Sequence, residues 1–272
     1  MKNLTIAELS QMRRVAVKAA EAAGLLLMRS YGRLQQKQVA RKGISDYVTD
    51  LDHAAERIVI KTIRKYYPDH GFKAEESGQS SSESLFEWVI DPVDGTTNYI
   101  HQFPIFCTSI GLCYKGKPVV GVIHDPLKKE LFHATKGGGA WLNRKRIRVA
   151  KRPGLRDALI ATGFPFRIRG RFGPYMRSFK EVFFHCSGIR RAGSAAIDLA
   201  YTAAGRIDGF WEMGLKPWDI AAGTIIIQEA GGVVSDFAGG DRYLEHGSIV
   251  AGNPRIQKGL VRILKKIFPS GK

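Results

Sequence analysis

The first part of the chain carries apolar residues with the period of an α-helix. Over residues 6–28 they recur every three or four positions with charged residues between them, which predicts an amphipathic helix ending at 31–32. A second such pattern starts at about Leu51 and is stopped by Pro68, because proline cannot continue a helix. Two helices are therefore expected before the first strand.

The period then changes to that of strands. Short runs of β-branched and aromatic residues, punctuated by KGK, DP and GGG, predict mainly strands over 88–143. The second half is mixed: a helix opened at Gly193 and Ser194, a strand over 206–213, a helix from Trp218 to the glycines at 231–232, and an amphipathic helix over 254–268. This order predicts an α+β protein in which helices cover a central, largely antiparallel sheet.

Neither a repeat nor a long linker divides the 272 residues. We therefore expect a single domain over 1–272, with an N-terminal part of about 1–150 and a C-terminal part of 151–272. No run approaches the roughly 18 apolar residues of a membrane span, and charges at helical spacing in the first 20 residues argue against a secretion signal. Cytoplasmic localisation and no membrane partner are expected.

Charge adds a second feature. Lys and Arg number 42 against 25 Asp and Glu, a net charge of +17 that attracts polyanions, either phosphorylated substrates or nucleic acid. Basic residues cluster over 143–156, over 166–171 and at Arg190–Arg191. Charge runs are more often a solvated surface than an RNA site. Three cysteines without CxxC spacing and seven histidines without HxxxH spacing argue against zinc.

The segment WVIDPVDGTTN (88–98) ends an apolar run at Asp91 and Asp94. Pro92 stops the strand and Gly95 permits a close turn, so two carboxylates enter one small space. Carboxylates so close repel each other, and one of them takes up a proton unless divalent cations hold both ionised. A plain Asp/Pro/Gly turn explains the same composition, and the segment alone leaves both interpretations open.

The backbone oxygen of Val93, between the two acids, is a further hard ligand for Mg²⁺. The GTT that follows predicts a helical turn whose free N–H groups suit a phosphate. Other acids occupy similar positions: Glu75 in KAEES, and Asp219 at the start of an apolar helix. As a helix cap Asp219 needs no metal, and the same holds for Asp46 and Asp52 before the second helix.

The segments AEES, WVIDPVDGTTN and PWDIAAGTIIIQEAGG together resemble, in order and spacing, the signatures of the inositol monophosphatase family of Mg²⁺-dependent, lithium-sensitive phosphatases. The similarity extends over nearly the whole chain. ATGFPF, GSAAIDLAY and VAGNPR resemble most closely the bacterial extragenic-suppressor branch. The resemblance implies a layered αβαβα sandwich, a homodimer, and two or three Mg²⁺ ions per site.

Residue roles follow from the same resemblance. It implies that Glu75, Asp91 and the Val93 carbonyl hold one metal, that Asp91, Asp94 and Asp219 hold a second, and that Glu75 faces a third. Asp52 and Thr96 would orient the attacking water, so that hydrolysis needs no covalent phosphoenzyme. The implied substrate contacts are Gly95, Thr96, Gly193, Ser194, Ala195, Glu212 and, from a neighbouring loop, Lys42.

Two positions bear on the substrate. Lys216 stands where animal relatives usually have histidine, which leaves contacts to the far side of the substrate open. Asn98 is typical of inositol phosphatases rather than of nucleotide-bisphosphate relatives. The implied substrates are inositol monophosphates and other small sugar or polyol phosphates.

Two alternatives stay open. Some microbial relatives act on fructose 1,6-bisphosphate. The extragenic-suppressor relatives are associated with transcription antitermination through RNA polymerase and transcription factors, and RNA binding at Arg190–Arg191 or at 143–156 is the corresponding hypothesis here.

Overall fold

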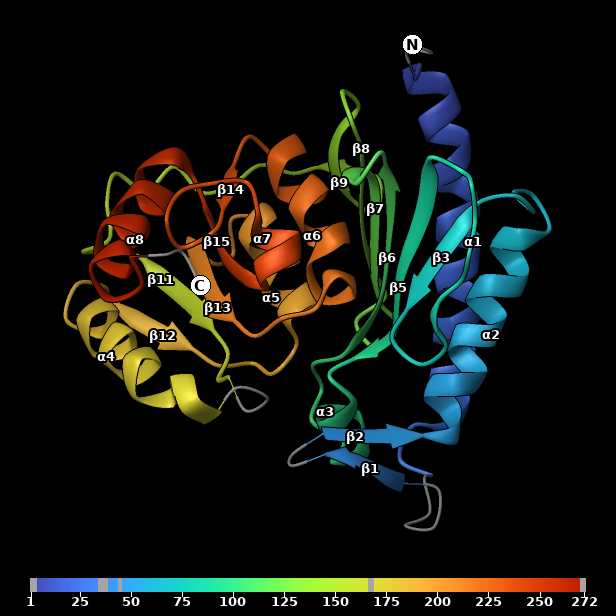
Figure 1. Cartoon of the computed structure of the whole chain (residues 1–272), viewed down its shortest axis with the longest axis horizontal. Coiled ribbons are helices and arrows are strands. Elements are labelled where there is room, and N and C mark those ends of the chain that lie inside the picture. Colours follow the sequence, from blue (N-terminus) through green and yellow to red (C-terminus); the bar gives the residue numbers. More distant parts are fainter. Residues whose placement is uncertain (1–3, 34–38, 44–45, 166–168, 270–272) are drawn as a thin grey trace.

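The computed structural model describes residues 4–33, 39–43, 46–165 and 169–269, and the side chains of 39–43, 46–48 and 169 lie outside that description. Two large sheets and the helices around them form its frame (Figure 1). No helix in the described ranges is long and apolar enough to cross a membrane.

The larger sheet has eight strands, and all its pairs are antiparallel except β3 with β5. In spatial order they are β10 (Lys145–Arg146), β9 (Gly139–Leu142), β8 (Glu130–Thr135), β7 (Lys117–Asp125), β6 (Cys107–Tyr114), β5 (Phe86–Asp94), β3 (Gly71–Ala74) and β4 (Gly78–Gln79). The one parallel pair brings the ends of β3 and β5 to the same edge.

The smaller sheet is mixed. In it β11 runs parallel to β12 and β13, whereas β15 is antiparallel to β13 and β14. Its order is β12 (Gly188–Arg190), β11 (Leu159–Thr162), β13 (Gly209–Met213), β15 (Ser248–Gly252) and β14 (Val233–Ser235). A separate hairpin pairs β1 (Val39–Gly43) with β2 (Asp46–Thr49).

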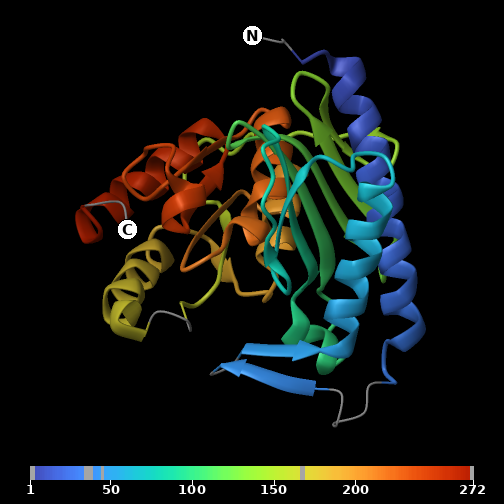
Figure 2. The ribbon, with the colours of Figure 1, turned by 45° about the vertical axis from the view of Figure 1, so that its right-hand side comes forward.

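Helices form three layers around these sheets (Figures 1 and 2). The outer layers are α1 (Ile6–Ser30) with α2 (Asp50–Arg64) on the larger sheet, and α4 (Phe172–Phe183) with α8 (Pro254–Ile267) on the smaller one. Between the sheets lie α5 (Ala195–Ala203) and α6 (Pro217–Glu229). Short pieces complete the chain: α3 (Thr96–Ile100), α7 (Tyr243–His246) and the 3₁₀ turn η2 (Arg169–Arg171). The expected αβαβα sandwich is confirmed.

The periodic segments give the predicted elements with shifted ends. The helix expected up to Pro68 ends at Arg64, and the strand region 88–143 also contains α3. Periodicity alone suggested one central sheet, whereas the strands of the second half form a sheet of their own. Periodicity also did not predict α4, which directly follows the basic cluster over 166–171.

The central helix α6 lies unusually close to the larger sheet. Gly111 and Gly121 are cross-strand partners on β6 and β7 and present a surface without side chains. A Cβ on Gly111 would lie 2.9 Å from the Cβ of Ala221, and one on Gly121 would lie 2.4 Å from the carbonyl oxygen of Ala222. Because α6 is buried nearly all round, its position depends on this flat contact.

We expect Gly121→Ala to lower the free energy of unfolding by about 1–3 kcal/mol, because the added methyl group meets the backbone of α6. Chemical denaturation followed by circular dichroism measures the loss. Gly154→Ala is the matched control, since nothing lies within 4 Å of its Cβ position. Equal stability of the two variants would contradict the close approach.

Candidate active site

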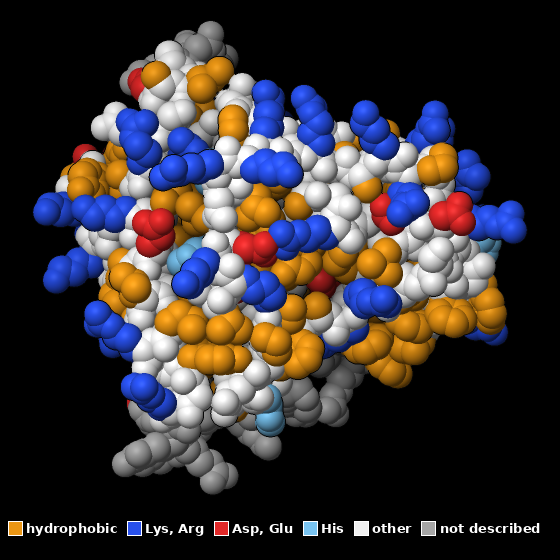
Figure 3. All heavy atoms as spheres, turned by 180° about the vertical axis from the view of Figure 1, so that it is seen from behind, with side chains coloured by type: hydrophobic (Ala, Val, Ile, Leu, Met, Phe, Trp, Pro, Cys, Tyr) orange, Lys and Arg blue, Asp and Glu red, His pale blue; other side chains and the backbone are white. Residues whose placement is uncertain are grey.

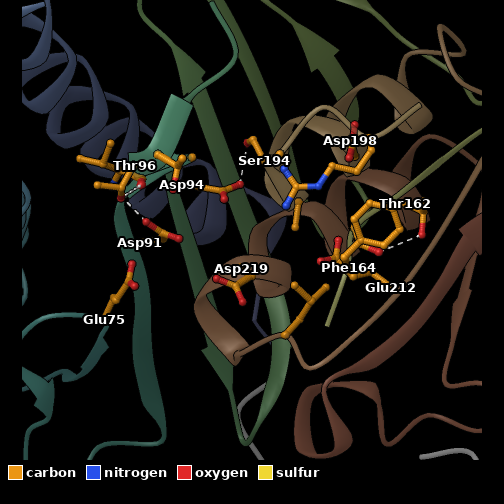
Figure 4. A pocket seen from close by; sticks show the side chains of 18 residues that line it. Glu75, Asp91, Asp94, Thr96, Thr162, Phe164, Ser194, Asp198, Glu212 and Asp219 are labelled. Atoms are coloured by element: carbon orange, nitrogen blue, oxygen red, sulfur yellow. Dashed lines mark hydrogen bonds between the residues drawn. The ribbon is translucent and has the colours of Figure 1, made fainter. Parts of the chain in front are cut away.

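A cleft of about 330 Å³ lies between the two halves of the chain (Figure 4). Its near wall is formed by the ends of β3 and β5 and the start of α3, and its far wall by β13 and the N-terminal ends of α5 and α6. Five of the residues predicted to hold metal line it, namely Glu75, Asp91, Val93, Asp94 and Asp219. So do six predicted substrate contacts, namely Gly95, Thr96, Gly193, Ser194, Ala195 and Glu212.

The parallel pair of strands places Glu75 beside Asp91. β3 and β5 pair with Ala74 opposite Ile90, so the next residue on each strand emerges at the same edge. The N–H of Glu75 donates to the carbonyl of Ile90 at 3.1 Å, which continues the ladder to the acid itself. The two carboxylates therefore approach each other although 16 positions separate them in sequence.

The turn that carries Glu75 is held from behind by a buried acid of α2. Glu56 accepts the N–H of Glu76 at 2.8 Å on Oε2 and that of Ser77 at 2.9 Å on Oε1. Two such hydrogen bonds from neighbouring N–H groups fix the turn relative to α2. Nothing in the local pattern distinguishes Glu56 from a solvent-facing acid of an amphipathic helix, so sequence reasoning missed it.

β5 leaves its regular register between Asp91 and Asp94, where its pairing with β6 shifts. Asp91 is 2% exposed, and its Oδ1 accepts the N–H of Val93 at 3.0 Å. Gly95 has φ +94°, and a Cβ there would lie 2.9 Å from the carbonyl oxygen of Ile105. Only glycine meets both conditions, which is why the turn into α3 can be this tight.

Asp94 joins the two halves of the molecule. Its Oδ2 accepts the hydroxyl of Ser194 at 2.7 Å and the N–H of Ala196 at 2.6 Å, both at the start of α5. The pKa of Asp94 is raised to about 6, because the effect of burial outweighs the opposite effect of these two hydrogen bonds. The Ser194 hydroxyl, predicted as a substrate contact, is thus engaged with this carboxylate.

Asp52 does not line the cleft but lies directly behind it, where it accepts a hydrogen bond from the Thr96 hydroxyl. It occupies the third position of α2 and completes a capping box with Thr49, which is the N-cap in place of Asp46 or Asp52. The N–H and hydroxyl of Thr49 donate to Oδ2 of Asp52 at 2.8 and 2.6 Å. Oδ1 is directed to the Thr96 hydroxyl at 3.1 Å, which also lies 2.9 Å from the Val93 carbonyl.

Asp219 enters the cleft from the first turn of α6. It is 6% exposed, and its Oδ2 accepts the N–H of Lys216 at 2.6 Å, so it acts within the helix start as well as facing the other acids. Lys216 itself is exposed and does not line the cleft. Lys42 lies on β1, and its side chain is outside the described part of the chain.

Negative charge is concentrated at this point. The pKa of Asp91 is raised well above its usual range, first by burial and then by the carboxylates of Glu75, Asp94, Asp219 and Asp52. No cationic side chain stands among these acids, since the one cation among the described lining residues belongs to the far wall. The fold therefore holds repelling carboxylates together, and either protonation or a bound cation relieves the repulsion.

Within the described residues no three acids, histidines or cysteines are placed so that they could together hold a metal ion as they stand. The donors are carboxylate oxygens and one backbone carbonyl, which suit a hard cation such as Mg²⁺. The unrelieved burial of Asp91 is the observation that makes a divalent cation fit.

The far wall contains the predicted contact Glu212 together with Asp198 and Arg191, which the sequence did not assign to the cleft. Asp198 of α5 is 1% exposed, and Glu212 of β13 is buried near it (Figure 4). Arg191 lines the same wall and interacts electrostatically with both acids. Arg191, expected on an RNA-binding surface, thus lines the cleft. Gly193, at φ +89°, leaves room for it, since a Cβ there would lie 2.7 Å from Nη1 of Arg191.

Asn98 supports this wall rather than facing a substrate. Its amide donates to the carbonyls of Ile105 and Ala192 at 2.7 and 2.9 Å and so ties α3 to the loop before α5. The side chain whose identity was linked to substrate choice therefore acts on the shape of the cleft.

A second hollow of about 830 Å³ lies between α4 and α8, on the outer layer. Leu155, Ile263 and Ile267 contribute apolar surface to it, and Glu181 is its one acid among the described residues. Six cations surround it, namely Arg177, Lys180, Arg255, Lys258, Arg262 and Lys266. We call it the basic groove.

Comparison with known proteins finds relatives over nearly the whole chain. The profile of the inositol monophosphatase family matches residues 8–268. The chain is 47% identical over 251 residues to Nus factor SuhB of Escherichia coli K12, covering 92% of this chain and 94% of that protein. It is 48% identical over 258 residues to inositol-1-monophosphatase of Mesorhizobium japonicum, with coverage of 94% and 97%.

Solved structures give the same result. Extragenic suppressor protein SuhB of Bartonella henselae superimposes with a TM-score of 0.90 at 46% identity, covering 93% of this chain and 98% of that one. Inositol monophosphatase from Anabaena superimposes with a TM-score of 0.86 at 40% identity, with coverage of 95% and 96%.

We expect Asp91→Asn to stabilise the metal-free protein by about 1–2 kcal/mol, because Asn keeps the Oδ1 acceptor for Val93 and removes a buried charge. We also expect Mg²⁺ at a hundredfold excess over Kd to stabilise the unsubstituted protein by about 2.7 kcal/mol, and so to raise its melting temperature. Thermal denaturation with EDTA and with Mg²⁺ measures both effects.

The exposed Asp241 provides the control, and Asp241→Asn should change neither quantity. A metal-free Asp91→Asn protein less stable than the parent, with an unchanged response to Mg²⁺, would show that Asp91 is an ordinary structural carboxylate.

Proposed function

The chain belongs to the inositol monophosphatase family, and from this premise we propose that it is a Mg²⁺-dependent phosphomonoesterase acting on inositol monophosphates and related small polyol phosphates. The supporting observation is the group of four acids from separate parts of the chain, Glu75, Asp91, Asp94 and Asp219, on one cleft beside the Gly95 turn. Carboxylates this close are unfavourable in ionised form unless cations balance their charge, and attack on a phosphate monoester needs the same compensation of charge.

In this proposal Glu75, Asp91 and the carbonyl of Val93 hold one Mg²⁺, and Asp91, Asp94 and Asp219 hold a second. When bound, Mg²⁺ supplies positive charge for the phosphate oxygens and lowers the pKa of water at the site. A third ion at Glu75 and inhibition by Li⁺ are part of the same proposal.

Asp52 and Thr96 orient the attacking water. Both hydrogen bonds from Thr49 go to Oδ2 of Asp52, which leaves Oδ1 to accept the Thr96 proton. With its proton directed to a carboxylate, the Thr96 oxygen accepts a hydrogen bond from water and turns the water's lone pair toward the phosphorus. The N–H groups of Gly95 and Thr96 are proposed to bind the phosphate oxygens.

The remainder of the substrate extends toward the far wall, where we propose contacts with Gly193, Ala195 and Glu212. Polyol hydroxyls suit these groups because backbone N–H donors and a carboxylate acceptor are both present. Fructose 1,6-bisphosphate is the alternative substrate. Measurement of phosphate release over a substrate panel decides between them.

A cytoplasmic homodimer is proposed as the working form. Support comes from exposed aromatic side chains at both ends of α4, since Phe172, Phe183 and Phe184 are 54%, 54% and 69% exposed. Figure 3 shows hydrophobic side chains gathered over this helix at the lower right. Apolar surface of this kind commonly marks a protein interface.

We expect Asp219→Asn to reduce phosphate release from inositol 1-phosphate at least about a hundredfold, because charge development at the phosphate loses its compensation. Release of inorganic phosphate with Mg²⁺, with EDTA and with Li⁺ measures activity, and circular dichroism checks folding. Asp157→Asn, on the exposed surface, is the control. Activity that persists in Asp219→Asn, or in EDTA, would exclude the proposed metal role.

A second candidate function is RNA binding in a transcription complex. The E. coli relative named a Nus factor motivates this candidate. We propose the basic groove as the RNA-binding surface, in place of Arg190–Arg191 or 143–156. Arg191 is directed to the cleft, whereas the groove lies on the outer layer with six cations and one acid. Four of the groove's cations lie three or four positions apart on α8 and form a row suited to a phosphate backbone, namely Arg255, Lys258, Arg262 and Lys266.

If the groove binds RNA, affinity should fall steeply with salt, and Lys258→Glu with Arg262→Glu should lower the slope of log K against log salt by roughly 1–2, the value for two phosphate contacts. Fluorescence anisotropy with labelled single-stranded RNA measures it. Lys61→Glu with Lys65→Glu on α2 makes the same charge change elsewhere. An identical loss in both double variants would assign binding to net charge alone.

A further inference from the structure

One acid of the far wall has a carboxylate oxygen without a hydrogen-bond partner among the described residues. Oδ1 of Asp198 is buried, and no hydrogen-bond donor among the described residues reaches it. The residue is 1% exposed and lines the cleft. Leaving a buried carboxylate oxygen without a donor is costly, and folded proteins seldom do so without a functional reason.

Asp198 is not needed to build its helix. The N-cap of α5 is Ser194, whose hydroxyl accepts the N–H of Ile197 at 3.3 Å. The Asp198 side chain makes no such capping bond, although it lies in the first turn. A purely structural role would therefore be served as well by a neutral side chain of the same shape.

The surroundings of Asp198 are acidic. Burial raises the pKa of Glu212 well above its usual range, and Asp198 is the next largest cause, so the two carboxylates are close. Gly163 makes room for Glu212, because a Cβ there would lie 2.0 Å from Oε1 of that acid. Arg191 acts on both carboxylates in the opposite direction. Two acids and one cation thus face the distal end of the cleft.

We propose that Asp198 is a specificity-determining residue: it accepts a hydroxyl of the polyol and, with Glu212, excludes substrates that carry a second phosphate at that end. The inference rests on the proposed phosphomonoesterase function and refines its substrate class to monophosphates of neutral polyols.

A hydroxyl and a phosphate differ in what they bring to this wall. The hydroxyl brings the donor that Oδ1 of Asp198 lacks, and a hydrogen bond to a carboxylate is among the stronger kinds. A second phosphate brings only acceptors and about two negative charges. Burial raises the pKa of both Asp198 and Glu212 well above the usual range, so this wall already disfavours negative charge. A second phosphate would add such charge there, and Arg191 is the one cation among the described lining residues that could offset it.

The test is Asp198→Asn, which keeps the shape and removes the charge. We measure kcat/KM for inositol 1-phosphate and for fructose 1,6-bisphosphate with Mg²⁺. The expected result is a loss of about tenfold for the monophosphate and a gain for the bisphosphate, so that the ratio of the two falls more than tenfold. The melting temperature should stay equal or rise, which loss of a structural carboxylate would not produce.

Asp157→Asn is the matched control and should leave the ratio unchanged. An active parent enzyme whose ratio is the same in Asp198→Asn would overturn the role of Asp198 and leave the proposed function standing. A folded, Mg²⁺-loaded parent that releases phosphate from neither ester would overturn both. A lower melting temperature with an unchanged ratio would assign Asp198 to the fold.

Discussion

The repulsion among carboxylates at the centre of the molecule is the constraint on which the rest of the structure depends. Asp91 is nearly inaccessible to solvent and faces Glu75, Asp94 and Asp219, with no cationic side chain among them in the described part of the chain. An arrangement of this kind is unfavourable in isolation, and it persists because the surrounding fold fixes each acid separately. The site thus concentrates negative charge, and the one cation among its described lining residues belongs to the far wall.

Each acid is held by a different element. The parallel pairing of β3 with β5 sets Glu75 against Asp91, and Glu56 anchors the turn from α2. The start of α5 holds Asp94 through a hydroxyl and an N–H. The close seating of α6 on two glycines positions Asp219. Since these elements come from both halves, forming the site and docking the halves are one event.

The two ends of the cleft carry different sets of groups. At the near end the acids, the Gly95 turn and the Asp52–Thr96 pair are arranged for a phosphate with its cations and water. At the far end two acids and Arg191 meet the remainder of a ligand without metal ligands of their own. In the proposed function, hydrolysis and substrate selection therefore depend on separate groups of the cleft.

The sequence by itself determined the elements with strong periodicity, namely the helices now seen as α1, α2, α5, α6 and α8, and the strands around Asp91. It also indicated the acids, because a carboxylate at the end of an apolar run is costly enough to be noticed locally. The metal ligands named from the family resemblance, and all the substrate contacts named from it except Lys42, line one cleft. Asp52 lies directly behind this cleft, and the side chain of Lys42 is outside the described part of the chain.

Only the tertiary structure decided which groups share a space. The existence of a second sheet, the anchoring role of Glu56, the turn of Arg191 into the cleft and the unpartnered oxygen of Asp198 left no mark on local pattern. The physical reason is that periodicity reports which face of an element is buried, whereas these features arise from register and contact between segments far apart in the chain.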